Sequence, residues 1–260
     1  MSTEVLRLIV FAAILTSLMV VEHFAPWRGQ AQRLRRWPSN LGVLLIDSAL
    51  VRLVFPVTAA GFAELCALKG WGLFNLLAVP GWIAFVLSAV ALDLAIYLQH
   101  RVFHHVPALW RLHRMHHADT MLDATSGTRF HPLEILLSMA IKLAAIAVLG
   151  APAAAVILFE ILLNATAMFN HANIVLPTRA DRVLRWFLVT PDMHRVHHSS
   201  ERIETDSNFG FSLPWWDYLF KTYNERPEKG LDGMEIGLEV FRDPGEQRLD
   251  RMLTQPFRDP

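Results

Sequence analysis

Three clusters of histidine are the part of this sequence that points most directly to chemistry. They hold His100 and His104, then His113, His116 and His117, then His194, His197 and His198. Spacings of three and four residues place side chains on one face of a helix, so each cluster is predicted to present its imidazoles in a common direction. Imidazole is the commonest neutral ligand of iron, zinc and copper. Because no single ion takes this many imidazoles, the sequence predicts a site for two metal ions.

The elements that carry the clusters are expected to be membrane helices. Apolar residues make up 53% of the 260 residues and charged residues only 18%, against roughly 25% charged in soluble domains. Apolar runs long enough to approach the bilayer core of about 30 Å cover residues 5–21, 41–68, 82–98, 133–149 and 151–168. The second run is expected to be kinked, since Pro56 and three charged residues interrupt it. The sequence thus predicts an all-α, multi-pass membrane helix bundle with four to five membrane helices.

Three regions follow from this pattern. Residues 1–92 carry membrane helices without a chemical motif. Residues 93–223 hold every cluster and a helical hairpin, 133–168, whose turn is marked by Gly150 and Pro152. Residues 224–260 form a charged tail, expected to be a cytosolic cap or a partly disordered end. The net charge is zero and basic and aromatic residues do not gather, so no nucleic acid partner is predicted, and the single Cys66 excludes an intramolecular disulfide.

The arginines predict an orientation. Arg28, Arg33, Arg35 and Arg36 follow the first apolar run with no acid between them. Loops rich in arginine and lysine stay in the cytoplasm, and counting helices from there brings all three clusters to the same, cytoplasmic side. The prediction is an integral membrane protein of a bacterial inner membrane or endoplasmic reticulum with a histidine-rich, two-metal cap in the cytoplasm.

Two acids lie within the apolar runs, where an ionisable residue is a functional hypothesis by default. Asp93 shares a helical stripe with His100 and His104, and Glu160 shares one with His171. Each acid can accept a hydrogen bond from a ligand imidazole or handle protons, or it can make a structural contact between helices. Both interpretations stay open for both residues at this point.

The order of the clusters on a membrane chain resembles the fatty acid hydroxylase and sterol desaturase superfamily of integral-membrane non-haem di-iron enzymes. Further segments are similar to that family over roughly residues 93–223. They are the link between the first two clusters (107–113), an HPxE element (131–134), the Thr-Pro-Asp-Met lead-in to the third cluster (190–193), and the stretches 208–210 and 213–217 that follow it.

The resemblance implies ten metal ligands, namely His100, His104, His113, His116, His117, His131, His171, His194, His197 and His198. His105 points about 100° around the helix from His104 and is expected to pack or hydrogen-bond instead. Asp93, Glu160 and Asp192, the last from the lead-in segment, are the candidate catalytic acids. The implied cofactor is two iron ions.

The activity that the resemblance implies is oxygenation of a lipid. A membrane-bound enzyme would hydroxylate an unactivated C–H bond of a sterol, fatty acyl, sphingoid or related lipid with O2, or desaturate it. Electrons would come from a separate donor, ferredoxin-like or cytochrome b5-like with its reductase, because the sequence has no flavin or dinucleotide fingerprint.

Two alternatives come from other classes of protein. A zinc-dependent membrane hydrolase would use few imidazoles with a catalytic carboxylate, typically HExxH, and that motif is absent. A haem-binding membrane electron carrier would place paired histidines deep within two facing helices, whereas these clusters fall at predicted helix ends.

Overall fold

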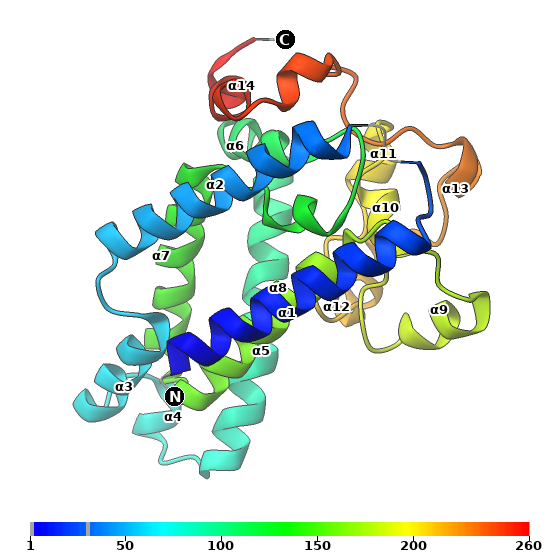
Figure 1. The fold of residues 1–260 in the computed structure, drawn as a ribbon. Coiled ribbons are helices and arrows are strands. Elements are labelled where there is room, and N and C mark those ends of the chain that lie inside the picture. Colours follow the sequence, from blue (N-terminus) through cyan, green and yellow to red (C-terminus); the bar gives the residue numbers. More distant parts are fainter. Residues whose placement is uncertain (1–2, 30–31, 260) are drawn as a thin grey trace.

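The computed structural model describes residues 3–29 and 32–259, and within these ranges every regular element is helical (Figure 1). This confirms the predicted all-α class. The membrane part consists of α1 (Thr3–Phe24), α2 (Arg33–Val54), α3 (Ala59–Lys69), α4 (Leu73–Leu76), α5 (Gly81–His105), α7 (Pro132–Leu149) and α8 (Ala153–Asn170). The remaining elements are α6 (Pro107–His117), η1 (Ala124–Thr128), α9 (Thr178–Leu184), α10 (Pro191–His197), α11 (Arg202–Thr205), α12 (Trp215–Leu219), α13 (Gly230–Gly233), η2 (Pro244–Gln247), α14 (Leu249–Thr254) and η3 (Gln255–Phe257).

Five stretches of the described residues are long and apolar enough to cross a membrane, which agrees with the predicted number. They are Glu4–Phe24, Arg33–Leu76, Gly81–His105, Pro132–Leu149 and Ala153–Asn170. The second stretch is interrupted as expected, because α2 ends at Val54 and α3 begins at Ala59. Pro56 lacks a backbone N–H and disfavours a helical conformation at the residue before it, so the chain turns between these two helices.

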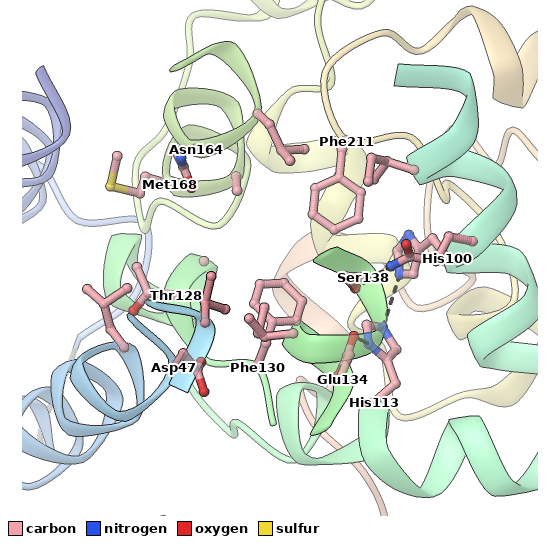
Figure 2. A pocket seen from close by; sticks show the side chains of 18 of the residues that line it. Asp47, His100, His113, Thr128, Phe130, Glu134, Ser138, Asn164, Met168 and Phe211 are labelled. Atoms are coloured by element: carbon pink, nitrogen blue, oxygen red, sulfur yellow. Dashed lines mark hydrogen bonds and ion pairs between the residues drawn. The ribbon is translucent and has the colours of Figure 1, made fainter. Parts of the chain in front are cut away.

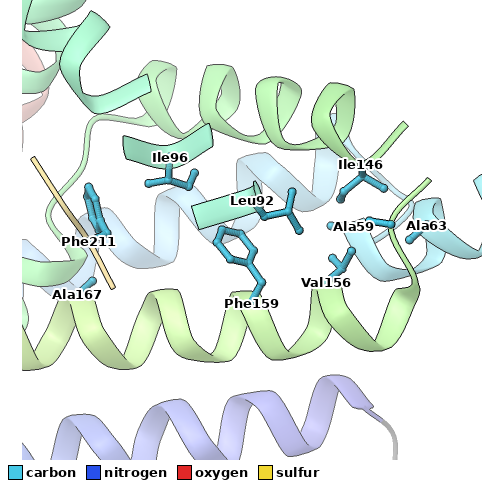
Figure 3. Packing of buried hydrophobic residues seen from close by; sticks show 10 residues of the cluster. Ala59, Ala63, Leu92, Ile96, Ile146, Val156, Phe159, Ala167 and Phe211 are labelled. Atoms are coloured by element: carbon cyan, nitrogen blue, oxygen red, sulfur yellow. The ribbon is translucent and has the colours of Figure 1, made fainter. Parts of the chain in front are cut away.

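Helices α5, α7 and α8 form the centre of the bundle. Helix α1 packs on α8, α2 packs on α7, and α3 packs on both arms of the α7–α8 hairpin. Figure 3 shows the apolar cluster that joins α5, α7 and α8, in which Leu92 of α5 lies near Ile146 of α7 and Phe159 of α8. Ala59 and Ala63 of α3 complete this cluster. Small residues at such contacts let helices approach closely, which favours packing where lipid removes the hydrophobic drive to associate.

One end of the bundle consists of turns between helices, and the other end carries the histidines. The α7–α8 turn and the segment between α3 and α4 meet at one end, where Gly72 lies against Gly150. The histidine-bearing helices α6 and α10 gather at the other end with the C-terminal elements (Figure 1). The expected histidine-rich cap is therefore present at one end of the bundle.

The C-terminal tail is part of this cap. Met252 of α14 is fully buried against Val43 of α2 and Met115 of α6. A disordered end, one of the two sequence-based expectations, does not fit this packing. Helix α9 and the turn after it expose Val183, Trp186 and Phe187, as expected for a segment at the membrane interface.

Replacement of Gly72 by alanine tests the far end of the bundle. Its φ is +94°, and a Cβ atom there would lie 2.1 Å from the backbone nitrogen of Gly150. We expect Gly72→Ala to destabilise the protein by about 2 kcal/mol or more, seen as a thermal midpoint several degrees lower. Gly81→Ala is the matched control, because no heavy atom lies within 4 Å of the added carbon. Equal midpoints for the two variants would contradict the Gly72–Gly150 contact.

Candidate metal centre

Nine histidines converge in two adjacent groups of buried side chains. One nitrogen from each member lies within 4.8 Å of every other in its group. The first group consists of His100, His104, His113, His117 and His197, and the second consists of His116, His171, His194 and His198. The two groups adjoin, since the rings of His117 and His198 stack with centroids 4.4 Å apart.

Each HxxHH cluster serves both groups, and the two clusters do so in opposite ways. His113 and His117 of α6, four residues apart, enter the first group while His116 enters the second. In the third cluster His194 and His198 enter the second group while His197 enters the first. The three imidazoles of a cluster thus share a helix face but separate between two sites, which spacing alone does not reveal.

Backbone carbonyls fix the imidazole tautomers. The Nδ1 atoms of four converging histidines lie at hydrogen-bonding distance from the carbonyl oxygens of Phe209 (His100, 2.8 Å), Arg129 (His116, 3.1 Å), Ala167 (His171, 2.6 Å) and Ser207 (His197, 2.7 Å). A carbonyl oxygen only accepts, so each Nδ1 carries the hydrogen and donates it. In the neutral ring the Nε2 atom then bears a lone pair.

Nε2 atoms of these and neighbouring imidazoles lie close together. His171 Nε2 lies 3.0 Å from His116 Nε2 and 3.1 Å from the Nε2 atoms of His194 and His198. In the first group His100 Nε2 lies 3.1 Å from His113 Nε2 (Figure 2), and the buried Nε2 atoms of His104, His117 and His197 have no partner among the described residues. Nitrogens that each bind one metal at about 2.1 Å are about 3.0–3.4 Å apart. The arrangement fits a metal ion in each group.

Six of the converging imidazoles outside the membrane spans have lowered pKa values. Burial lowers the pKa of His171 to about 4 and that of His197 to about 3. Burial, followed by neighbouring imidazoles, also places the pKa values of His116, His117, His194 and His198 well below their ordinary value. Only the neutral ring offers a lone pair to a metal, so these rings need no deprotonation at neutral pH.

Two carboxylates bond to ligand histidines. Glu134 Oε1 lies 2.7 Å from His113 Nδ1, and Asp206 Oδ1 lies 3.2 Å from His104 Nδ1. Such contacts orient the ring and raise its basicity. Glu134 stands in the HPxE element but received no role from the sequence, and Asp206 carries no sequence signal at all.

Asp217 positions one of the carbonyls. Its carboxylate accepts hydrogen bonds from the backbone nitrogens of Phe209 (2.8 Å) and Gly210 (2.9 Å) and from the hydroxyl of Thr222 (2.7 Å). It thereby holds the Phe209 carbonyl against His100. Burial nevertheless raises the pKa of Asp217 to about 6. The WWD stretch was noted for its resemblance only, so this function of Asp217 was missed.

A buried ion network supports the second cluster. Arg36 of α2 pairs with Asp119 (2.6 Å) and Asp123 (2.7 Å), and all three side chains are inaccessible to solvent. Burial alone would raise the pKa of Asp119, but Arg36 and Arg129 outweigh it and hold that pKa at about 2. Arg129 donates to the Met115 carbonyl (2.9 Å) and its own carbonyl accepts from His116. The network therefore ties α2 to the histidine-bearing face of α6.

The structure does not bring four of the residues singled out from the sequence to either group. His131 caps α7, with Nδ1 accepting from Leu133 N (3.2 Å) and Nε2 donating to the Leu253 carbonyl (3.2 Å). Both of its nitrogens are thus engaged, which leaves none for a metal. Asp93 accepts from Trp216 Nε1 (2.8 Å) and Leu213 N (3.3 Å), which is the structural contact between segments.

The other two acids are paired with cations. Glu160 binds Lys142 (2.6 Å) and Arg7 (2.8 Å) within the bundle, and Asp192 pairs with Arg195. Arg195 in turn donates to the carbonyls of Ala172 and Ile174 just after His171. Glu160 therefore contacts no imidazole, and Asp192 acts on the site only through the chain that follows His171.

A cavity of about 280 Å³ reaches the first group from the membrane part of the bundle. Helices α1, α2, α5, α7 and α8 line it, together with Phe130 and Phe211. Figure 2 shows His100 and His113 at one side and Asp47 of α2 at the other, with the two phenylalanines between them. Most of the other lining is apolar, so the cavity suits a hydrocarbon chain.

Metal content after single substitutions tests the ligand assignment. We expect His171→Ala to lose about half or more of the bound metal, because His171 Nε2 lies at the centre of the second group. His131→Ala, which changes a helix cap outside both groups, should retain the metal. Metal analysis of both purified variants by mass spectrometry is the measurement. Loss of metal in His131→Ala with none in His171→Ala would overturn the assignment.

Three known proteins illustrate what this chain is similar to. An ornithine lipid hydroxylase from Rhizobium tropici is 30% identical over 66% of this chain and 50% of its own length. An alkylglycerol monooxygenase from Xenopus tropicalis is 25% identical over 86% of the chain and 49% of its own length. A very-long-chain aldehyde decarbonylase from rice (Oryza sativa) is 26% identical over 75% of the chain and 30% of its own length.

The chain therefore spans half or less of the length of these relatives. No solved structure matches it. The fatty acid hydroxylase family model matches residues 85–222, which include all nine converging histidines. The chain belongs to the fatty acid hydroxylase family.

Proposed function

We propose that this protein is a membrane-bound di-iron oxygenase that hydroxylates an unactivated C–H bond of a lipid. One observation carries the proposal: two adjoining groups of buried imidazoles border an apolar cavity inside a membrane bundle. The names of the relatives, a lipid hydroxylase, a monooxygenase and an aldehyde decarbonylase, support a lipid substrate and O2 as co-substrate.

The donor set supports two irons rather than one zinc. Structural zinc sites are four-coordinate, and catalytic ones use three protein ligands with an open position. The first group offers five imidazoles, and only nitrogen ligands enter either group. A haem carrier is disfavoured because the imidazoles form one group of five and one group of four, whereas haem ligands would form pairs on two facing helices. Two irons held there would supply the electrons and the oxidising power that dioxygen activation and C–H cleavage require.

The chain itself contributes geometry and exclusion of water. The nine imidazoles are almost completely buried, and Phe209, Phe211 and Phe130 pack against their rings. A lipid chain in the cavity would reach the side that His100 and His113 form. Holding one carbon next to the metals converts an encounter into an oriented reaction. Glu134, bonded to His113 at the same side, is placed to orient that ring and to hold a proton.

The flanking arginines support a cytoplasmic position for the cap. We place the cap in the cytoplasm, where a separate ferredoxin-like or cytochrome b5-like donor can deliver electrons. Flanking arginines have structural partners as well: Arg36 is fully buried against Asp119 and Asp123, Arg28 donates to the carbonyls of Leu231, Asp232 and Met234, and Arg33 donates to the carbonyl of Glu22. Positive charge still flanks α1 on this side, which favours the orientation.

Oxygen incorporation tests the function. Protein purified anaerobically should contain about two irons per chain without haem absorption. Membranes that contain it, supplied with reductant and ¹⁸O2, should yield a lipid heavier by one ¹⁸O atom, and His171→Ala should reduce the product to background. His105→Ala is the matched control, since His105 is exposed and bonds only to its own helix. One zinc per chain, or no labelled lipid from loaded protein, would contradict the proposal.

A further inference from the structure

We infer that Asp47 of α2 anchors a hydrogen-bond-donating group, an amine or a hydroxyl, carried by the lipid that occupies the cavity. The inference rests on the proposed function only in taking this cavity as the lipid site. It makes Asp47 a residue that determines specificity, although it lies in the N-terminal region that carries no motif.

Asp47 faces the cavity without a partner. Its side chain lines the cavity and points into it from α2 (Figure 2). The residue is only 5% exposed, and its buried Oδ1 atom has no hydrogen-bond partner among the described residues. Nor does any lysine, arginine or histidine of those residues form an ion pair with it. A buried carboxyl without a partner costs free energy, so an unfilled acceptor here indicates a bound group.

Two other acids within the membrane part, Glu160 and Asp93, have partners in the protein. Glu160 has two cations, Lys142 and Arg7, and Asp93 accepts from the indole of Trp216. Glu160 is neutralised by its two cations, whereas Asp93 uses only Oδ2 and keeps a buried Oδ1 without a partner among the described residues, but neither acid lines the cavity. Asp47 alone among the three lines the cavity of about 280 Å³ and lacks such a contact.

The chemistry of the lining selects a donor. Glu134, which also lines the cavity, bonds to His113 through Oε1 and leaves Oε2 without a partner. The hydroxyls of Ser48 and Thr128 are already used, as they donate to the carbonyls of Leu44 (2.7 Å) and Thr125 (2.8 Å). The free capacity of the two carboxyls is therefore to accept hydrogen bonds. A lipid group that donates, above all an ammonium, would stabilise the ionised carboxyl, which only accepts, whereas a group that only accepts can bond to a carboxyl only in its protonated form.

The position of Asp47 also bears on which carbon reacts. Asp47 and the His100–His113 pair lie at opposite sides of the cavity (Figure 2). A volume of about 280 Å³ is at the small end for ligand pockets, roughly 300–1,000 Å³, so it holds one chain segment with a small polar group. A donor bound at Asp47 would thus set a fixed distance along the chain to the carbon beside the metals.

The test compares probes that differ only in their polar end. Decylamine, decanol and methyl decyl ether are added at equal membrane concentration to the metal-loaded protein in phosphatidylcholine nanodiscs, and binding is read from the rise in thermal unfolding midpoint. The amine and the alcohol should bind wild type more tightly than the ether. In Asp47→Leu their affinity should fall about tenfold or more to that of the ether, whose own affinity should not fall.

Two further variants show whether an ammonium or a hydroxyl is recognised and whether the preference depends on Asp47 itself. Asp47→Asn keeps an acceptor, so loss of the amine alone would assign recognition of an ammonium, and retention of the alcohol would assign a hydroxyl as sufficient. Ser48→Ala removes a hydroxyl one residue away that is bonded to Leu44, and the donor preference should persist in it. Midpoints without probe report whether each variant folds.

Equal binding of the three probes to wild type, or a donor preference that survives Asp47→Leu, would overturn the inference. Neither result depends on turnover, so it is distinct from failure of the proposed oxygenase. A protein that incorporates ¹⁸O but shows no Asp47-dependent preference would refute the inference alone. A protein that shows the preference but contains no iron would refute the oxygenase alone.

Discussion

Mutual repulsion of imidazole lone pairs is the constraint on which the rest of the structure depends. The Nε2 atoms of His116, His194 and His198 lie within 3.1 Å of His171 Nε2, and carbonyls hold the hydrogens of His116 and His171 on their Nδ1 atoms. The lone pairs of His116 and His171 therefore face each other at 3.0 Å, which is unfavourable unless a cation lies between the rings. The fold must therefore hold the rings in place against this repulsion, and much of the cap outside the ligands serves that purpose.

The restraint comes from parts of the chain that are distant in sequence. The loop after α11 supplies the carbonyls of Ser207 and Phe209, and Asp217 holds that loop closed. Arg36 reaches from α2 to Asp119 and Asp123, more than eighty residues away. A buried ion pair costs free energy unless every charge is matched and hydrogen-bonded, and here Ser126 adds a further contact to Arg36. Loss of one member would leave a buried charge beside the metal ligands.

The sequence predicted what local patterns encode and missed what tertiary contacts decide. Composition and apolar runs predicted the helical class, the interrupted second span and the hairpin. Spacing and resemblance predicted nine of the histidines that converge, including the isolated His171. They also suggested His131, whose position next to a proline instead makes it the cap of α7. Asp206, Asp217 and Asp119 escaped notice because a carboxylate becomes a partner of a histidine or its loop only once the chain has folded.

The opposite division of the two HxxHH clusters has a consequence for assembly. Helix α6 contributes two histidines to the first group and one to the second. The α10 segment contributes one histidine to the first group and two to the second. A rotation of either helix that displaces one ligand therefore displaces ligands of both groups. The two sites cannot form separately, and the C-terminal tail, which packs Met252 on Met115 of α6, becomes part of the same unit.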